Sequence, residues 1–176
     1  EGRLRPVYVK GEGLPAVSLR DSECFQLILA DGQTLKASDM KIVGGLRVDV
    51  LGKGRGIEGF FVTLTTPDDR LGIQWHAALR NGSNYLRQHV SIGAKTTDVD
   101  VREIVLVQLN AQDAKPAGTL DGSPITIADR YFFAFEHPLS KVRSLDSQVQ
   151  SSLSRSRPLK VGEEQTYSSV IGVAPE

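Results

Sequence analysis

The sequence predicts an all-β protein, a two-layer antiparallel β-sandwich. Turn signals recur at short intervals, at Asp31-Gly32, Gly44-Gly45, Pro67-Asp68-Asp69, Asn81-Gly82, Asp121-Gly122 and Val161-Gly162. Between them lie short runs rich in Val, Ile, Phe, Thr and Tyr, and no stretch reads as a long helix. Short β-prone runs separated by turns at this spacing are typical of β-sandwiches and barrels.

The composition describes one ordinary globular domain, residues 1–176. Hydrophobic residues make up 40% and charged residues 24% of the chain, which leaves room for a substantial core. The 21 acidic and 21 basic residues balance. This balance argues against nucleic acid as a partner, because that class demands a positive excess. No apolar run approaches the roughly 20 residues that span a bilayer.

The first half of the chain reads as hairpins. In CFQLILADGQTLKAS, Phe25, Leu27 and Leu29 share one strand face, and Asp31-Gly32 suits a two-residue turn. The run GFFVTLTT, residues 59–66, alternates between two faces, with its first phenylalanine on the same face as the valine and leucine that follow. Both runs therefore predict strands with one face toward a core.

The second half continues the pattern. Residues 71–92 read as two strands around Asn81-Gly82-Ser83, and VREIVLVQL, residues 101–109, reads as a central strand covered on both faces. The segment 139–160 also fits a helical stripe, but its recurrent serines compete for backbone hydrogen bonds. We therefore interpret 147–155 as a strand, followed by a turn at 160–163 and a last strand that carries Tyr167.

The chain ends and the cysteine content bear on location. Residue 1 is Glu1 and the only methionine is Met40, so we expect a removed signal peptide or an excised fragment. On the first alternative the protein is periplasmic or extracellular. Cys24 is the only cysteine, which excludes an internal disulfide and a cysteine metal cluster. We expect neither a metal nor any other cofactor.

The run YFFAFEHP, residues 131–138, contains the candidate catalytic pair Glu136 and His137. Successive side chains of a strand point to opposite faces, so the two cooperate only if the strand end twists at Pro138. The alternative is structural: Glu136 pairs with an arginine, and His137 caps loop backbone. The general behaviour of carboxylates in ion pairs favours this structural interpretation.

A second cluster lies in WHAALRNGSNYLRQH, residues 75–89. Trp75 and His76 lie on one predicted strand, and Tyr85, Arg87 and His89 share one face of the next. Aromatic rings stack on sugars, and Arg and His bond sugar hydroxyls, so we treat Trp75, Tyr85, Arg87 and His89 as candidate carbohydrate contacts. The structural alternative is that the aromatic residues belong to the core and Arg87 is a buried cation.

Two further patterns are weaker. His76, His89 and His137 could form an all-imidazole zinc site, but their spacing does not support one. The glycine-rich GKGRGIEG, residues 52–59, lacks the ending of a phosphate-binding loop, and no helix pattern follows it. A mobile connection between strands fits that segment better.

Three strings carry a resemblance to a known family: ALRNGSNYLRQHVSI, GSPITIADRYFFAFEHPLS and PLKVGEEQTYSSVIGVAPE. They resemble the N-terminal β-domain of bacterial glycoside hydrolases of the α-galactosidase-like type, over residues 60–173. The resemblance implies the galactose mutarotase-like supersandwich fold, in which two large antiparallel sheets pack face to face. It also implies a separate C-terminal catalytic domain in the same polypeptide, because such domains precede a catalytic barrel.

The sequence therefore leaves three alternative functions for this chain. The first is a non-catalytic accessory domain that supports the catalytic domain of a glycoside hydrolase and contacts carbohydrate. The second is a stand-alone mutarotase-like enzyme that uses Glu136 with His137 or His89. Mutarotases take the base glutamate and the acid histidine from separate strands, which the adjacent Glu136 and His137 do not match. The third is a structural or adhesive module.

Overall fold

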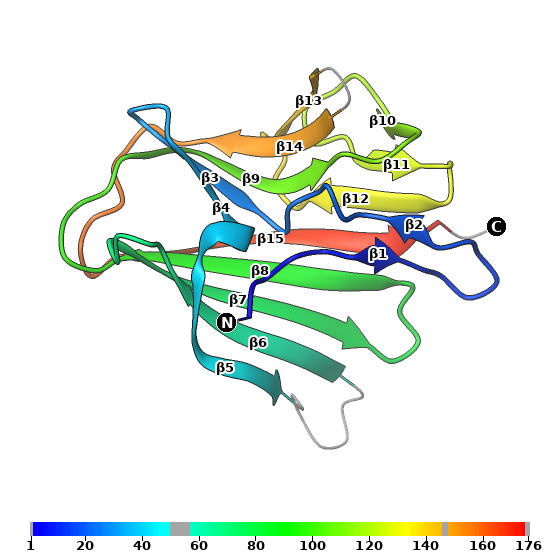
Figure 1. Cartoon of the computed structure of the whole chain (residues 1–176). Helices are drawn as coiled ribbons and strands as arrows, with labels where there is room; N and C mark the ends of the chain where they lie inside the picture. Colours follow the sequence, from blue (N-terminus) through cyan, green and yellow to red (C-terminus); the bar gives the residue numbers. More distant parts are fainter. Residues whose placement is uncertain (1, 50–56, 146–147, 175–176) are drawn as a thin grey trace.

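The computed structural model describes residues 2–49, 57–145 and 148–174. These residues form antiparallel strands and one turn of 3₁₀-helix, η1 (Ala37–Asp39) (Figure 1). No helix in the described part of the chain is long and apolar enough to cross a membrane. The predicted all-β antiparallel class is confirmed.

The strands form two large sheets and one short ribbon. The larger sheet has the order β10 (Ala114–Pro116), β11 (Ile125–Ile127), β12 (Tyr131–Phe135), β15 (Glu164–Val173), β8 (Tyr85–Ala94), β7 (Leu71–Arg80), β6 (Ile57–Thr65), β5 (Lys41–Asp49). The smaller sheet has the order β13 (Lys141–Leu145), β14 (Gln148–Ser154), β9 (Val101–Leu109), β3 (Gln26–Leu29), β4 (Thr34–Lys36). The ribbon pairs β1 (Tyr8–Val9) with β2 (Val17–Ser18).

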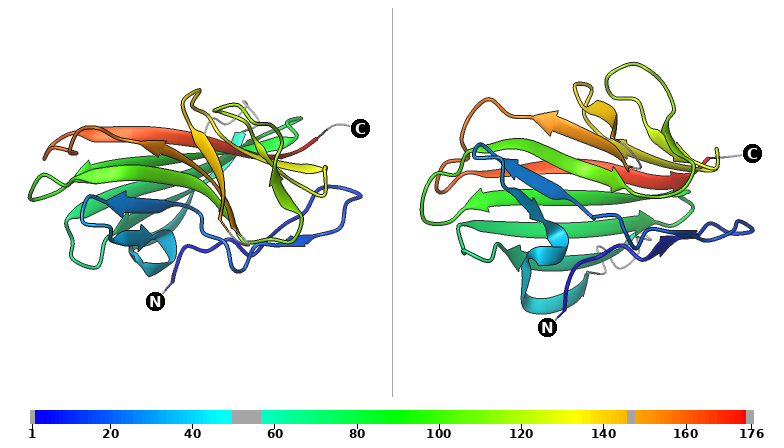
Figure 2. Two further views of the ribbon diagram at one scale, coloured as in Figure 1. Left: turned by 90° about the horizontal axis from the view of Figure 1, so that it is seen from above. Right: turned by 45° about the horizontal axis from the view of Figure 1, so that its top comes forward.

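The two large sheets lie face to face and enclose the core (Figure 2). On the larger sheet, Val62, Leu64 and Ile73 are buried and pack in one cluster with Leu27 of the smaller sheet. A second cluster joins β11 and β12 to the end of β9 and to β14. The period-2 pattern of the strands thus supplies each sheet with one apolar face, and stacking removes both faces from water.

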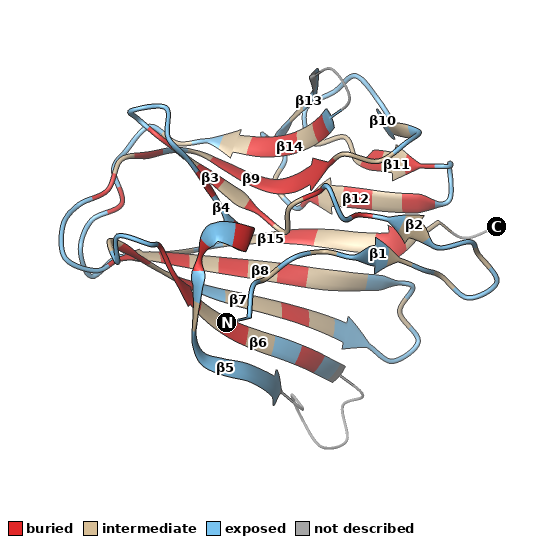
Figure 3. Cartoon of the chain, viewed as in Figure 1, coloured by how far each residue is buried: buried red, intermediate tan, exposed pale blue. Residues whose placement is uncertain are grey.

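The strand β9 is the centre of the smaller sheet. Every residue from Ile104 to Leu109 is buried, as the continuous apolar run predicts (Figure 3). Its alternate side chains divide between the two clusters: Ile104 and Leu106 belong to the first, Val107 and Leu109 to the second. The predicted strand at 147–155 is also confirmed, as β14, which pairs with β9.

Two predicted turns differ from the structure. Ala30, Asp31 and Gly32 form a three-residue loop closed by the Leu29–Gln33 hydrogen bond, in which Gly32 has a φ of 86°. The third residue is needed because it places glycine in the left-handed conformation that completes this loop type. Gly44 and Gly45 make no chain reversal; they form an irregularity inside β5 between Val43 and Leu46. Residues 50–56, which include most of GKGRGIEG, lie outside the described residues.

The smaller sheet covers only part of the larger one. The end of β6 and β7 that holds Leu64 and Ile73 is buried, whereas Phe60 and Leu79 at the other end are 48% and 46% exposed. The edge strand β5 is exposed along most of its described length (Figure 3). One end of the apolar face therefore remains open to solvent.

Candidate functional site

The predicted sugar-contact residues divide between the two faces of the larger sheet. Trp75 pairs with Val90 and lies on the inner face, whereas Tyr85, Arg87 and His89 lie on the outer face. One residue's difference in register places a side chain on the opposite face. Trp75 therefore does not share a surface with the other three candidate carbohydrate contacts.

The outer face gathers two imidazoles. His76 of β7 pairs with His89 of β8, and their rings stack with centroids 6.0 Å apart. His76 Nε2 is buried without a hydrogen-bond partner, and a Cβ on Gly59 would lie 2.7 Å from it. The adjacent glycine thus provides the space that the His76 ring occupies on the sheet.

The environment of His89 favours the neutral imidazole. Partial burial lowers the pKa of His89, and the nearby His76 and Arg87 lower it further, while Glu136 opposes the shift. Desolvation and like charge both disfavour a protonated ring. His89 is therefore suited to accept or donate a hydrogen bond as an uncharged ring near neutral pH.

Arg87 is held between an acid and an aromatic ring. Its Nε and Nη2 donate to Glu136 Oε1 at 3.2 and 2.8 Å. Its guanidinium carbon lies 5.7 Å from the centre of the Tyr85 ring, a cation–π distance. The two contacts fix a guanidinium whose side chain is 43% exposed, so it can still meet a ligand.

Glu136 and His137 face opposite ways. Glu136 lies on the outer face with Arg87, and its backbone N–H donates to Ser168. His137 Nδ1 accepts a hydrogen bond from the Leu139 backbone N–H at 3.2 Å, and its ring meets the edge of Phe135. The ion pair and the loop contact are those of the structural interpretation, and the two side chains do not form an acid–base pair.

The three histidines do not converge. His76 and His89 are neighbours on the outer face, whereas His137 lies beyond β12 against Phe135. Among the described residues, no group of three or more His, Cys, Asp or Glu side chains has the geometry to hold a metal ion. His137 is thus apart from the other two imidazoles.

Trp75 belongs to a buried polar network on the inner face. Its indole Nε1 donates to Gln88 Oε1 at 2.7 Å. Gln88 Nε2 in turn donates to the Cys24 carbonyl and to Ser169 Oγ, at 3.2 and 3.0 Å. This network ties β7, β8 and β15 to the segment before β3 and fixes the plane of the indole.

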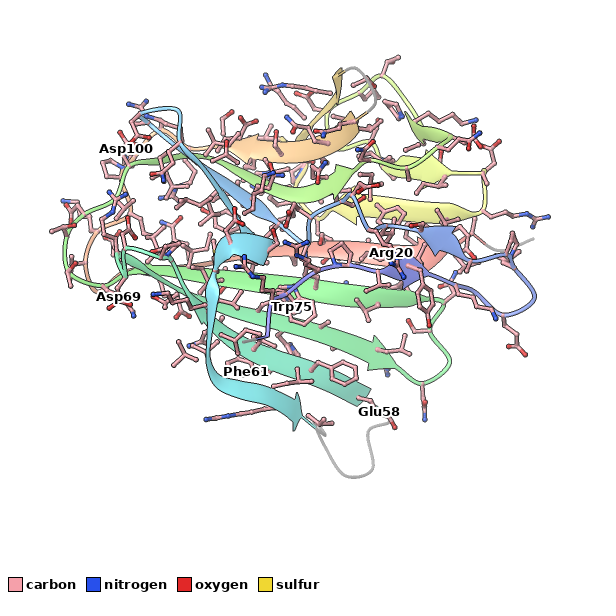
Figure 4. All side chains as sticks on the ribbon, in the orientation of Figure 1. Arg20, Glu58, Phe61, Asp69, Trp75 and Asp100 are labelled. Carbon is pink, nitrogen blue, oxygen red and sulfur yellow. The ribbon has the colours of Figure 1, made fainter. Side chains whose placement is uncertain are left out.

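Trp75 also lines a cleft of about 1080 Å³ at the open end of the sheet. Residues 4–6 and 8–12 of the N-terminal segment and β6–β8 contribute to its walls, and the buried Leu106 and Gln108 of β9 also line it. Figure 4 labels Trp75 on the larger sheet. The alternation in the sequence predicts that Phe60 shares a face with Val62 and Leu64, as observed, but it does not predict the cleft. Alternation reveals the face of a side chain, but not where the opposing sheet stops.

Cys24 lies at the same cleft but is not an activated nucleophile. Burial, helped by the neighbouring Glu23 carboxylate, raises the pKa of its thiol to about 12. The reactive species of cysteine is the thiolate. Cys24 therefore stays a neutral thiol at physiological pH.

No protein-family model matches the sequence, and no curated protein matches it. Among solved structures, the fold is similar to the GH36 α-galactosidase AgaB from Geobacillus stearothermophilus, with a TM-score of 0.53 and 12% identity over 86% of this chain and 30% of that chain. The α-galactosidase AgaA A355E D548N of the same organism, in complex with raffinose, gives 0.52 and 9% over the same shares.

The galactosidase domain of the α-galactosidase–sucrose kinase AgaSK gives a TM-score of 0.53 and 10% identity over 97% of this chain and 31% of that chain. The chain therefore spans less than a third of the length of these three structures. At this level of identity the likeness shows the fold. The chain has the β-sandwich architecture that recurs as one part of these glycoside hydrolase structures.

Proposed function

We propose that this chain is an accessory β-sandwich domain of a larger glycoside hydrolase, where it supports a separate catalytic domain in the same polypeptide. The likeness to parts of α-galactosidase chains supports the family context. On this proposal residues 1–176 form one domain that precedes the catalytic unit. The protein is exported to the periplasm or beyond, which fractionation of the producing cells would test.

The main observation in support of a non-catalytic role is that the charged groups of the outer face, Arg87 and Glu136, are paired with each other. Glycoside hydrolysis needs two carboxyl groups that face each other across the scissile bond. Glu136 is engaged by two donors of Arg87, and His137 is turned to the other side of the strand. Glu136 and His137 therefore each make a structural contact, Glu136 with Arg87 and His137 with the Leu139 backbone.

The test compares the full polypeptide with a version that lacks residues 1–176. We expect the truncated enzyme to retain its active-site residues but to unfold at a lower temperature, because it loses a supporting domain. Thermal unfolding and hydrolysis of nitrophenyl α-galactoside are the measurements. Unchanged unfolding temperature and rate would contradict the proposal.

The alternative hypothesis, a stand-alone mutarotase-like enzyme, predicts a different result. If the isolated chain interconverted galactose anomers, and Glu136→Gln abolished the reaction, the accessory role would be wrong. Polarimetry on fresh α-galactose measures this directly. We expect the interconversion to proceed at its uncatalysed rate with either protein.

The outer face is the proposed sugar-contacting surface. Tyr85 is 37% exposed, Arg87 is held in place beside it, and His89 offers a neutral ring. A pyranose could stack on Tyr85 and direct its hydroxyl groups toward the neighbouring strand, where they would donate hydrogen bonds. Calorimetry with galactose and raffinose should detect millimolar binding that Tyr85→Ala weakens and Tyr8→Ala, at an exposed tyrosine of the N-terminal ribbon, does not. An absence of heat would remove the sugar contact and leave the supporting role.

A further inference from the structure

We propose that the cleft at the open end of β6–β8 binds a neutral, mostly apolar molecule with one hydroxyl group, of the aryl alcohol class. This site lies on the opposite face of the sheet from Tyr85, Arg87 and His89. It does not depend on the accessory role. Its volume of about 1080 Å³ is near the upper end of ligand pockets, roughly 300–1,000 Å³.

The sheet wall of the cleft is mostly apolar and only partly covered. Phe60 and Leu79 line it with about half of each side chain exposed, and the Trp75 indole lies between their strand positions and the core. Leu86 and Leu106 continue the apolar lining. Adjacent large apolar side chains that stay open to solvent mark a binding surface, because water leaves them readily when an apolar body enters.

One polar group in this lining has no partner. Gln108 lines the cleft and is only 3% exposed, yet its Oε1 makes no hydrogen bond. A buried acceptor without a donor is unfavourable, and native proteins rarely leave one. Oε1 is covered in this conformation, but the last side-chain torsion of glutamine is broad, so a partial rotation can bring it to the cleft wall. A ligand hydroxyl that reaches Gln108 would supply the missing donor.

The other buried glutamine is not available. Gln88 Oε1 already accepts from Trp75, and Gln88 Nε2 already donates to Cys24 and Ser169. Gln108 is therefore the unsatisfied amide of the cleft. One free acceptor at the wall of an apolar site selects a ligand with one donor rather than none.

This arrangement does not suit a free hexose. A sugar carries several hydroxyl groups, and each needs a partner when water is removed. Of the charged side chains at the cleft, Arg5, Lys10 and Glu12 belong to the N-terminal segment and are exposed. The fourth, Glu23, is half-buried, and its carboxylate already accepts from the backbone N–H and the hydroxyl of Ser38. The apolar sheet wall and the one unsatisfied amide oxygen, that of Gln108, thus favour a ring or short chain with a terminal hydroxyl.

The test uses the single tryptophan as a reporter. Trp75 gives one indole N–H resonance, and the probes are benzyl alcohol and benzyl methyl ether, which differ in the hydroxyl donor. We expect benzyl alcohol to shift the resonance saturably and to bind about fivefold more tightly than the ether, the worth of one net hydrogen bond. Gln108→Met should abolish the difference, whereas Gln74→Met, at an exposed position of β7 on the opposite face of the larger sheet, should preserve it.

A second pair of variants covers the case in which Gln108→Met does not fold. Phe60→Ala removes a partly exposed cleft wall and should weaken both probes, whereas Phe61→Ala, on the outer face, should not. Three results would overturn the proposal. They are no saturable shift at tens of millimolar benzyl alcohol, equal affinity for alcohol and ether, and tighter binding of galactose than of benzyl alcohol at Trp75.

Discussion

Two buried glutamines between the sheets differ in the hydrogen bonds that their side chains make. Gln88 uses both ends of its carboxamide, since Oε1 accepts from Trp75 and Nε2 donates to Cys24 and Ser169. Gln108 is equally buried, but its Oε1 has no partner. A satisfied amide in a low-dielectric interior rigidifies its surroundings, whereas an unsatisfied one opposes folding. Residues of the same type and burial therefore have opposite effects.

The same substitution at both glutamines should separate these effects. Gln88→Met leaves the Trp75 N–H and the Ser169 hydroxyl without their partner, and should lower the free energy of unfolding by about 2 kcal/mol. Gln108→Met removes an unsatisfied acceptor and should be neutral or stabilising. Urea unfolding measures both. An equal loss at the two positions would show that Gln108 is satisfied in solution.

The reactivity of the Cys24 thiol tests whether this side chain is buried in the folded protein. Because desolvation raises the pKa of its thiol to about 12, the thiolate is scarce in the folded protein. We expect a thiol-specific reagent to react slowly with the native protein at about pH 8 and rapidly in urea, where the pKa returns to its ordinary range near 8.5. Equal rates in both conditions would mean that Cys24 is solvated in the native state.

His89 should make stability depend on pH. Its pKa is lowered in the folded protein, so below the ordinary value of about 6.5 the unfolded chain binds more protons than the folded one. Stability should therefore fall as the pH is lowered through about 6.5. Urea unfolding of His89→Gln should lose this slope, and His137→Gln should keep it.

The contribution of Asp68 to stability changes at a lower pH than that of His89. A hydrogen bond from Thr66, helped by Arg70, lowers its pKa to about 2. A carboxyl with a depressed pKa contributes stability above its ordinary value near 3.9, and the contribution is lost as the pH falls through the folded pKa. The two groups can thus be distinguished, because His89 accounts for the loss near neutrality and Asp68 for the loss in strong acid.

At the scale of elements, glycines decide how closely strands and rings approach. Gly172 of β15 pairs with Phe132 and Tyr85, and a Cβ there would lie 2.6 Å from Phe132 Cε1 and 2.8 Å from Tyr85 Cβ. The Phe132 ring covers the glycine on the outer face of the sheet. This contact packs β12 against β15 and β8 in the layer that carries Arg87 and Glu136.

Gly172→Ala should therefore be destabilising, by about 1–3 kcal/mol, because the added methyl meets Tyr85 Cβ as well as a movable ring. Gly93→Ala is the matched control in β8, where the nearest atom to a new Cβ is Glu163 O at 3.7 Å. The control should change the free energy of unfolding by only a few tenths of a kcal/mol. Similar losses for both variants would show that the Phe132 contact yields freely.

At the scale of the whole molecule, the two sheets overlap incompletely. The smaller sheet covers one end of β6 and β7, and the open end forms the wall of the cleft. The face that would complete a symmetric sandwich is thereby available to a ligand, while the outer face carries the polar cluster. The likeness to parts of larger carbohydrate-active enzymes is a likeness of this architecture.

Hydrogen exchange should map this asymmetry. The amides of β9 are covered on both faces and paired with β14 and β3 on both sides, so they should exchange most slowly. The edge strand β5 pairs only with β6 among the described strands and is irregular at Gly44-Gly45, so its amides should exchange faster. Protection of β5 comparable with β9 would imply that the open end is covered in solution.

Local chemistry allowed the strands, the burial of β9 and the opposed directions of Glu136 and His137 to be predicted, because alternation follows from the backbone of each strand. It did not determine that Arg87 meets Glu136 from 49 residues away, since β15 must first insert between their strands. Nor did it place Trp75 on the opposite face from Tyr85 or reveal the cleft. Strand order and the extent of sheet overlap arise from long-range packing, which no single segment of the chain encodes.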